Sequence, residues 1–315
     1  MRPILNTKSF KQIPYFLFLL FGLLYLRSFF EIDSLPDYAS YKNIYENPDN
    51  FKNWNIAFTT LASMSSRIIS FDVFRLLIFL CGVAVYYQVF KLASRSSFIL
   101  IISAVCIVLL EFFMIRIRGG VSIFLFYVGL YHIRKSSISL SIIFFSLSGL
   151  FHIATFVTIF LIYWPQILRV RLNVPFLLLN LAIWLSFLLL VDYISLGRGA
   201  HLYSSINPAR IFLLMICPVF LLLVLSQMKF AKIKISHNAE FFGLLVLTSA
   251  LLLLFFVGVF VTSGEAIVRI YSVVAGPVLL RGLIENYDHW PGSYRNYALV
   301  VLACNSLFFI NTVYI

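Results

Sequence analysis

The sequence predicts an all-α integral membrane protein, a polytopic helical bundle that forms one transmembrane domain over residues 1–315. Of the 315 residues, 62% are hydrophobic and only 11% are charged, whereas a soluble domain has roughly 45–50% apolar and about 25% charged residues. Apolar runs of about 20 residues, the length that crosses a bilayer core, recur along the chain. Lys and Arg gather in short clusters between these runs, as in membrane proteins whose loops carry an orientation signal.

The apolar runs predict about eleven membrane spans, because each helix needs about 20 residues to cross the bilayer. We expect these spans at Ile13–Phe30, Val73–Phe90, Phe98–Ile115, Gly119–Tyr131, Ile138–Phe151, Ala154–Ile167, Val174–Ile194, Ile211–Met228, Phe241–Thr262, Ile270–Ile284 and Tyr297–Val313. The first run lacks a small-x-small cleavage site, so we interpret it as an uncleaved helix. Residues 138–167 are too many for one span and few for two, which predicts a tight hairpin of half-length helices.

The basic residues predict that the N-terminus lies in the cytoplasm and the C-terminus on the outer side. With this orientation most of the 24 Lys and Arg residues fall in the inner connections, among them Arg134, Lys135 and Arg281. This distribution satisfies the positive-inside rule. The first outer loop, residues 31–72, is acidic instead.

Within this outer loop the sequence predicts an amphipathic helix that lies on the outer membrane surface. Apolar side chains recur there at helical spacing, and polar side chains such as Thr59 and Arg67 fill the other face. The apolar face consists of Trp54, Ala57, Phe58, Leu61, Met64 and Ile68. A short helix packed within the loop is the alternative.

The composition and the motifs exclude several classes of protein. The net charge of +12 is not gathered on a soluble face, and no nucleic-acid-binding motif is present, so no nucleic-acid partner is expected. The four cysteines lie inside apolar runs without CxxC spacing, which argues against a disulfide framework or a zinc site. Nucleotide-binding loops, zinc-hydrolase motifs and serine-hydrolase motifs are absent. We therefore expect neither a cofactor nor a metal ion.

Ionisable residues at the outer face are the candidates for a functional site, because charge at membrane depth is costly and therefore marks function. These candidates are Glu111, Arg116, Arg118, His152, Arg198, His201, Arg210, Glu265 and Arg269. Converging guanidinium groups bind phosphate oxygens in bidentate fashion, so a lipid-linked pyrophosphate is the expected ligand. Phospholipid headgroups use the same chemistry and remain an alternative.

The strongest local signal surrounds Arg118, which precedes Gly119 and Gly120. Glycine allows a ligand or another backbone to approach closely. Arg116 and Arg118 close the third predicted span. If this helix continues through Arg118, Glu111 shares its face and Arg116 points to nearly the opposite side.

Each candidate also has a structural alternative. An arginine at a helix end often snorkels to headgroups, and a lone histidine there is usually a structural residue. Glu265 and Arg269 are four residues apart, which is the spacing of an ion pair on a helix. Arg198, His201 and Arg210 share one short outer loop, where ordinary loop residues are equally expected.

Several segments of the chain together match the pattern of a known family. They are the acidic outer loop with Asp37, Tyr38, Tyr41 and Tyr45, then Ile115–Ile123 (IRIRGGVSI), Leu150–Ala154 (LFHIA) and Val268–Tyr271 (VRIY). The last three are similar to segments written "iRqglA", "lFHkSA" and "R-i-x-Y". The chain thereby resembles the EpsG-like branch of the Wzy polysaccharide polymerases. It departs from that pattern at Gly119–Gly120, where Gln-Gly is usual, and at Ile153, where Lys or a polar residue is common.

The resemblance implies a GT-C-like bundle and a metal-independent glycosyltransferase in a bacterial inner membrane, with its active site at the outer face. The donor is then a growing glycan on undecaprenyl pyrophosphate, and the acceptor is the non-reducing sugar of a new lipid-linked repeat unit. Expected partners are this lipid-linked oligosaccharide, membrane lipid, and a chain-length regulator and a flippase of the same pathway.

The resemblance also implies roles for individual residues. Arg118 holds the donor pyrophosphate, with Arg269 or Arg210 as a second clamp. His152 deprotonates the acceptor hydroxyl or orients a sugar, since its ordinary pKa suits either role. The remaining candidates are Glu111 and Asp37 for acceptor binding or base, and Arg116, Arg198, His201, Tyr38 and Glu265 for substrate binding.

Other classes of membrane protein remain as alternatives. An O-antigen ligase or a membrane acyltransferase also uses outer-face Arg and His, but a ligase usually has a larger outer loop. A lipid-linked-oligosaccharide flippase or another transporter needs charged residues deep in several spans. Here the charges crowd the outer rim, with Arg27 and Arg75 as the deeper candidates, which favours an enzyme over a transporter. A purely structural membrane subunit is a further alternative.

Overall fold

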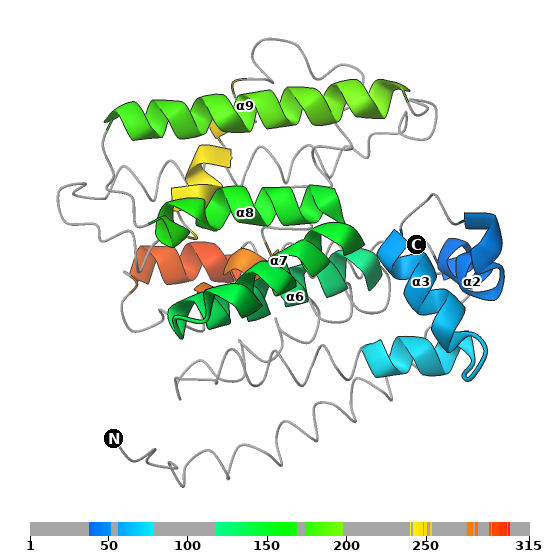
Figure 1. The fold of residues 1–315 in the computed structure, drawn as a ribbon. Coiled ribbons are helices and arrows are strands. Elements are labelled where there is room, and N and C mark those ends of the chain that lie inside the picture. The colour runs from blue at the N-terminus through cyan, green and yellow to red at the C-terminus, as the bar shows by residue number, and fades with distance from the viewer. Residues whose placement is uncertain are drawn as a thin grey trace, which may run out of the picture.

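The computed structural model describes residues 38–51, 56–78, 117–168 and 174–197, and shorter stretches between residues 240 and 302. Its labelled elements are α2 (Tyr38–Glu46), η3 (Pro48–Phe51), α3 (Ile56–Ser65), α6 (Ile117–Arg134), α7 (Ile138–Phe151), α8 (Ile153–Ile167) and α9 (Val174–Gly197). These stretches contain helices and turns and no strand (Figure 1). The all-α class is therefore confirmed for the described part of the chain.

The predicted spans in the middle of the chain coincide closely with helices. The bounds of α7 are those predicted, and α8 begins one residue earlier than predicted. α6 extends beyond the predicted Gly119–Tyr131 at both ends, and α9 continues past Ile194. Hydropathy locates only the apolar stretch, whereas polar residues at the ends still join the backbone hydrogen-bond ladder of the helix.

The half-length hairpin predicted within residues 138–167 is also confirmed. α7 and α8 have 14 and 15 residues, and His152 alone joins them. The backbone of His152 is extended, with φ −159° and ψ 93°. A helix cannot continue through this conformation, so one residue ends the first helix and starts the second.

The other predicted spans lie wholly or partly outside the described residues. Wholly outside are Ile13–Phe30, Phe98–Ile115 and Ile211–Met228. The other four spans are represented by helical residues 71–78, 242–247, 276–279 and 292–300. Within the part of the chain that the structure describes, no helix is both long enough and apolar enough to cross a bilayer.

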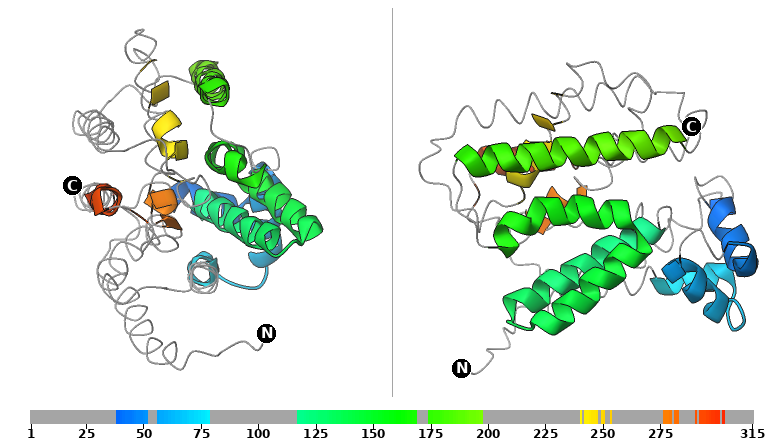
Figure 2. Two further views of the ribbon diagram at one scale, coloured as in Figure 1. Left: turned by 90° about the vertical axis from the view of Figure 1, so that its left-hand side faces the viewer. Right: turned by 45° about the horizontal axis from the view of Figure 1, so that its top comes forward.

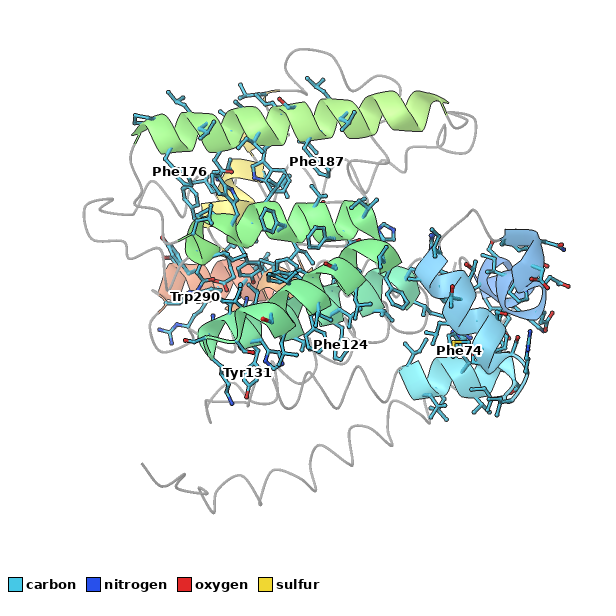
Figure 3. The ribbon with its side chains drawn as sticks, in the orientation of Figure 1. Phe74, Phe124, Tyr131, Phe176, Phe187 and Trp290 are labelled. Atoms are coloured by element: carbon cyan, nitrogen blue, oxygen red, sulfur yellow. The ribbon has the colours of Figure 1, made fainter. Side chains whose placement is uncertain are left out.

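Helices α6 to α9 run in alternating directions, so their ends gather at two opposite ends of the bundle (Figures 1 and 2). The start of α6 and the α7–α8 junction lie at one end, beside α2 and α3. The tight turn at Arg134 and Lys135, between α6 and α7, lies at the other. In Figure 3, Phe74 marks the α2–α3 end, and Tyr131 and Trp290 lie toward the opposite end. The basic turn is thus far from α2, α3 and residues 71–78, which form the outer-loop segment, named after the loop predicted over residues 31–72.

The expected helix in the outer loop exists as α3, but the predicted division into two faces is wrong. Phe58 and Thr59, which were assigned to opposite faces, are both buried. The Phe58 ring packs against Tyr41 at a centroid distance of 5.3 Å and against Phe74 at 6.2 Å. Met64 and Ile68, by contrast, are 67% and 81% exposed. Aromatic partners from α2 and from residues 71–78 decide which face is buried, and local periodicity does not contain this information.

Among the residues that the structure describes, two charged side chains lie in the interior of the bundle, which corrects the prediction that Arg281 is an inner-loop charge. Arg281 is 2% exposed and Glu240 is 1% exposed. The guanidinium carbon of Arg281 lies 4.7 Å from the centre of the Tyr163 ring and 5.1 Å from that of Tyr127. Aromatic faces stabilise a desolvated guanidinium by roughly 2 kcal/mol or more. Arg281 is therefore buried, although it lies near the end of an apolar run in the sequence.

The contact of α8 with residues 242–247 leaves no room for a side chain at Gly243. A Cβ atom there would lie 2.8 Å from Cα and 2.9 Å from the carbonyl oxygen of Ile162. Because backbone atoms cannot rotate away, Gly243→Ala should destabilise the protein by about 1–3 kcal/mol. Gly292→Ala is the matched control, since that Cβ would meet nothing within 4 Å, and should be neutral or slightly stabilising. Thermal unfolding of the purified variants measures both, and equal midpoints would contradict this packing.

Candidate functional site

Arg118 connects the bundle to the outer-loop segment. It lies in the first turn of α6, on the same helix as Gly119 and Gly120, and is half-buried. Its Nε atom donates a hydrogen bond of 3.3 Å to the Tyr41 hydroxyl oxygen on α2. The guanidinium carbon lies 5.7 Å from the centre of the Tyr41 ring. Two of the segments that carried the family resemblance, distant in sequence, therefore meet at one side-chain contact.

The side chains of α2 that face inward follow helical spacing. They are Tyr38, Tyr41, Ile44 and Tyr45, which recur at intervals of three and four residues and form one face. The Tyr45 hydroxyl donates a hydrogen bond of 2.9 Å to the carbonyl oxygen of Ile69. Tyr41 was quoted for the resemblance but was not among the predicted site residues. The spacing of these tyrosines was the signal that could have identified it as a buried, fixed residue.

A reciprocal pair of buried serines sets the register between α6 and α7. Ser122 Oγ donates to the carbonyl oxygen of Ser148 at 2.9 Å, and Ser148 Oγ donates to that of Ser122 at 2.7 Å. Arg118 lies four residues before Ser122, and His152 lies four residues after Ser148. Because α6 and α7 run in opposite directions, both residues are displaced by about one turn toward the same end. The serine pair thereby brings Arg118 and His152 to the α2–α3 end.

His152 uses one ring nitrogen to cap α8. Its Nδ1 atom accepts a hydrogen bond of 3.2 Å from the backbone N–H of Thr155, and its own backbone N–H donates to the carbonyl oxygen of Ser148 at 3.1 Å. When Nδ1 of a neutral imidazole is the acceptor, the proton lies on Nε2. In this arrangement Nε2 is a hydrogen-bond donor. Both predicted roles of His152 toward a substrate stay predictions.

The first turns of α6 and α8 pack directly against each other. A Cβ atom at Gly119 would lie 3.8 Å from the Thr155 hydroxyl oxygen, which is ordinary van der Waals contact. Thr155 is also the residue whose N–H binds His152. The residue next to Arg118 is thus in contact with the turn that holds the His152 ring.

Tyr38, a predicted substrate-binding residue, lies in the core of the outer-loop segment. It is 6% exposed, and its hydroxyl donates a hydrogen bond of 3.4 Å to the Asp72 carboxylate. The guanidinium carbon of buried Arg75 lies 4.7 Å from the centre of the Tyr38 ring. These contacts give Tyr38 a packing role, and substrate binding by Tyr38 stays a prediction.

The other predicted site residues lie outside the described residues. They are Asp37, Glu111, Arg116, Arg198, His201, Arg210, Glu265 and Arg269. The structure brings together Arg118, His152 and the segment that contains Tyr38, and it leaves the proposed roles of the others as predictions. Among the residues it describes, no three His, Cys, Asp or Glu side chains are grouped as a metal site would need.

Comparison with known protein families shows to which family the chain belongs. The sequence model of the EpsG family matches residues 12–314, nearly the whole chain. The chain belongs to the EpsG family. This family is associated with Wzy-type polysaccharide polymerases, so the resemblance found in the sequence is confirmed. No curated protein and no solved structure matches the chain.

Membership of the EpsG family assigns the chain to polysaccharide biosynthesis, with a glycosyltransferase-type polymerase as the kind of activity that the family suggests. The match includes Tyr41, Arg118 and His152, so the cluster at the α2–α3 end lies wholly inside the family region. Chemically, this cluster offers a guanidinium group and an imidazole N–H. Both are donors suited to anionic or hydroxyl-rich ligands.

Substitution of His152 separates its capping role from any role toward a substrate. Asparagine is a good N-cap residue, so His152→Asn should keep the bond to Thr155 N–H and unfold at a temperature close to that of the unsubstituted protein. It lacks the Nε2 donor, so polysaccharide production should fall roughly tenfold, which corresponds to the loss of one hydrogen bond of about 1.4 kcal/mol. His152→Ala removes both functions and should also lose about 1 kcal/mol of stability. Full production by His152→Asn would mean that the histidine only caps α8.

Proposed function

We propose that this EpsG family protein polymerises a polysaccharide by joining lipid-linked oligosaccharide repeat units at the outer face of a bacterial inner membrane. One observation carries the proposal: Arg118, Tyr41 and His152 gather at one end of the bundle. The basic turn at Arg134 and Lys135 lies at the opposite end. By the positive-inside rule, such a turn marks the cytoplasmic side. The cluster then belongs to the outer face.

The proposed reaction is a glycosyl transfer from a pyrophosphate-linked donor. A hydroxyl of the non-reducing sugar of the acceptor attacks the anomeric carbon of the donor glycan, and a new C–O bond forms. The bond from that carbon to the pyrophosphate oxygen breaks, and undecaprenyl pyrophosphate leaves with the electron pair. The hydroxyl proton passes to a carboxylate, for which Glu111 and Asp37 are the candidates. His152, with its Nε2–H donor, orients a sugar or the leaving group.

Arginine side chains can stabilise this leaving group without a metal ion. Negative charge develops on the pyrophosphate as the bond breaks, and preorganised cations aimed at that charge lower the barrier. Arg118 supplies one guanidinium, and Arg269 or Arg210 supplies the second in the proposed site. A guanidinium binds two phosphate oxygens at once. The proposed enzyme is therefore a metal-independent glycosyltransferase.

The distribution of apolar side chains supports a location in the membrane. Ile138, Ile142 and Leu150 expose apolar surface along α7, and Met64 on α3 and Ile68 in the turn after it do so as well. Exposed apolar patches of this kind mark interaction with lipid or protein. We propose a GT-C-like bundle of about eleven spans, the number that its apolar runs allow. Its N-terminus is cytoplasmic, and α3 rests on the outer leaflet.

Transport of a lipid-linked oligosaccharide is a second candidate function, and one observation favours it. Arg281 and Glu240 are buried inside the bundle, although the sequence had placed the charges mainly at the outer rim. Charged groups within several spans are what a transporter requires. The bundle thus contains both the buried pair Arg281 and Glu240 and the cluster of Arg118, Tyr41 and His152. An experiment therefore has to distinguish transport from polymerisation.

Loss of the gene distinguishes the two functions. The surface glycan of a deletion strain is separated by size on a gel. A polymerase predicts that the ladder collapses to a single lipid-linked repeat unit at the surface, because units still arrive and are not joined. A transporter predicts that the single unit also fails to reach the surface. An unchanged ladder would contradict both functions.

Variants of Arg118, returned to the deletion strain, test the pyrophosphate clamp. Arg118→Ala and Arg118→Lys should both lose polymer, by roughly a hundredfold, because they remove a charge-stabilising donor of the transition state. Lysine keeps the charge but cannot bind two phosphate oxygens in a fixed geometry. Expression is followed on blots. Full polymerisation by the expressed Arg118→Lys protein would show that the clamp role is wrong.

A further inference from the structure

The contact between Arg118 and Tyr41 has a defined geometry. The Nε–H group of Arg118 points to the Tyr41 hydroxyl oxygen, 3.3 Å away. A guanidinium offers phosphate two bidentate edges, one formed by Nε with a terminal nitrogen and the other by the two terminal nitrogens. We propose that Tyr41 positions Arg118 so that it binds the pyrophosphate of a lipid-linked donor through its Nη1–Nη2 edge. This inference rests on the proposed function and adds to it a positioning residue and a binding mode.

Tyr41 is fixed by its own packing and not by the arginine. It is 5% exposed, and its ring meets Phe58 edge-on at a centroid distance of 5.3 Å. Phe58 in turn packs against Phe74. A hydroxyl held by a packed core has little freedom to follow a moving partner, so Tyr41 can define the position of the more mobile side chain.

A phosphate that used the Nε edge would have to displace this hydroxyl. Displacement would break the bond between Nε and the buried hydroxyl, which costs free energy. The Nη1–Nη2 edge needs no such displacement. Holding Nε also fixes the plane of the guanidinium, which lowers the conformational entropy that a ligand must remove on binding.

The matched test uses Tyr41 and Tyr45 of α2, since the hydroxyl group of each takes part in a hydrogen bond with another segment. Tyr41→Phe removes the partner of Arg118 and keeps the ring, whereas Tyr45→Phe removes the bond to the Ile69 carbonyl oxygen and leaves Arg118 untouched. The full-length protein is reconstituted in phosphatidylcholine nanodiscs, and binding of undecaprenyl pyrophosphate is titrated. Tyr41→Phe should weaken binding about tenfold, since hydrogen bonds to charged groups are strong. Tyr45→Phe should stay within about twofold, as changes remote from a site usually do.

A double variant shows whether Tyr41 acts through Arg118. If it does, Tyr41→Phe combined with Arg118→Ala should bind no more weakly than Arg118→Ala alone. Effects that add would overturn the positioning role, as would equal losses in Tyr41→Phe and Tyr45→Phe. Normal binding by Tyr41→Phe beside weak binding by Arg118→Ala would overturn this inference and leave the clamp intact. Normal binding by Arg118→Ala would remove the clamp of the proposed function itself.

Discussion

The reciprocal hydrogen bonds between Ser122 and Ser148 are the constraint on which the site depends. Both serines are fully buried, and each donates to the carbonyl oxygen of the other. A shift of α6 along α7 would leave these groups unpaired inside the bundle, at a cost of roughly 1–3 kcal/mol for each group. The register is therefore well determined. It places Arg118 one turn before the pair and His152 one turn after it, at the same end of the bundle.

The outer-loop segment contributes Tyr41 to the candidate site at this end of the bundle. Its core is aromatic, with Tyr45 and Phe74 at a centroid distance of 4.8 Å, so α2 and α3 form a small packed unit. That unit presents Tyr41 to Arg118 and leaves the apolar side chain of Met64 exposed. In the proposed function this unit lies between the membrane surface and Arg118, an arrangement suited to a substrate whose reactive phosphate sits at that surface.

The buried charges of Arg281 and Glu240 show that the bundle is not simply apolar inside. Two tyrosine rings cover the guanidinium, and Trp290 is packed so closely to this region that a side chain at Gly282 would collide with its ring. Buried charge is costly unless it is compensated. The two tyrosine rings provide such compensation for Arg281. Arg281 and Glu240 lie in a part of the molecule separate from the cluster at the α2–α3 end.

The sequence by itself determined the helical class, the family, the bounds of α7, and the start of α8 to within a residue. These features depend on composition, short motifs and the length of apolar runs, all of which are local. Only the tertiary structure decided that Arg118 meets Tyr41, that Phe58 and not Met64 is buried, and that Arg281 lies in the core. Each of these outcomes depends on a partner from another segment, 77 positions away for Arg118. Packing between helices determines which distant side chains meet. The periodicity of the sequence describes one helix at a time and does not indicate these partners.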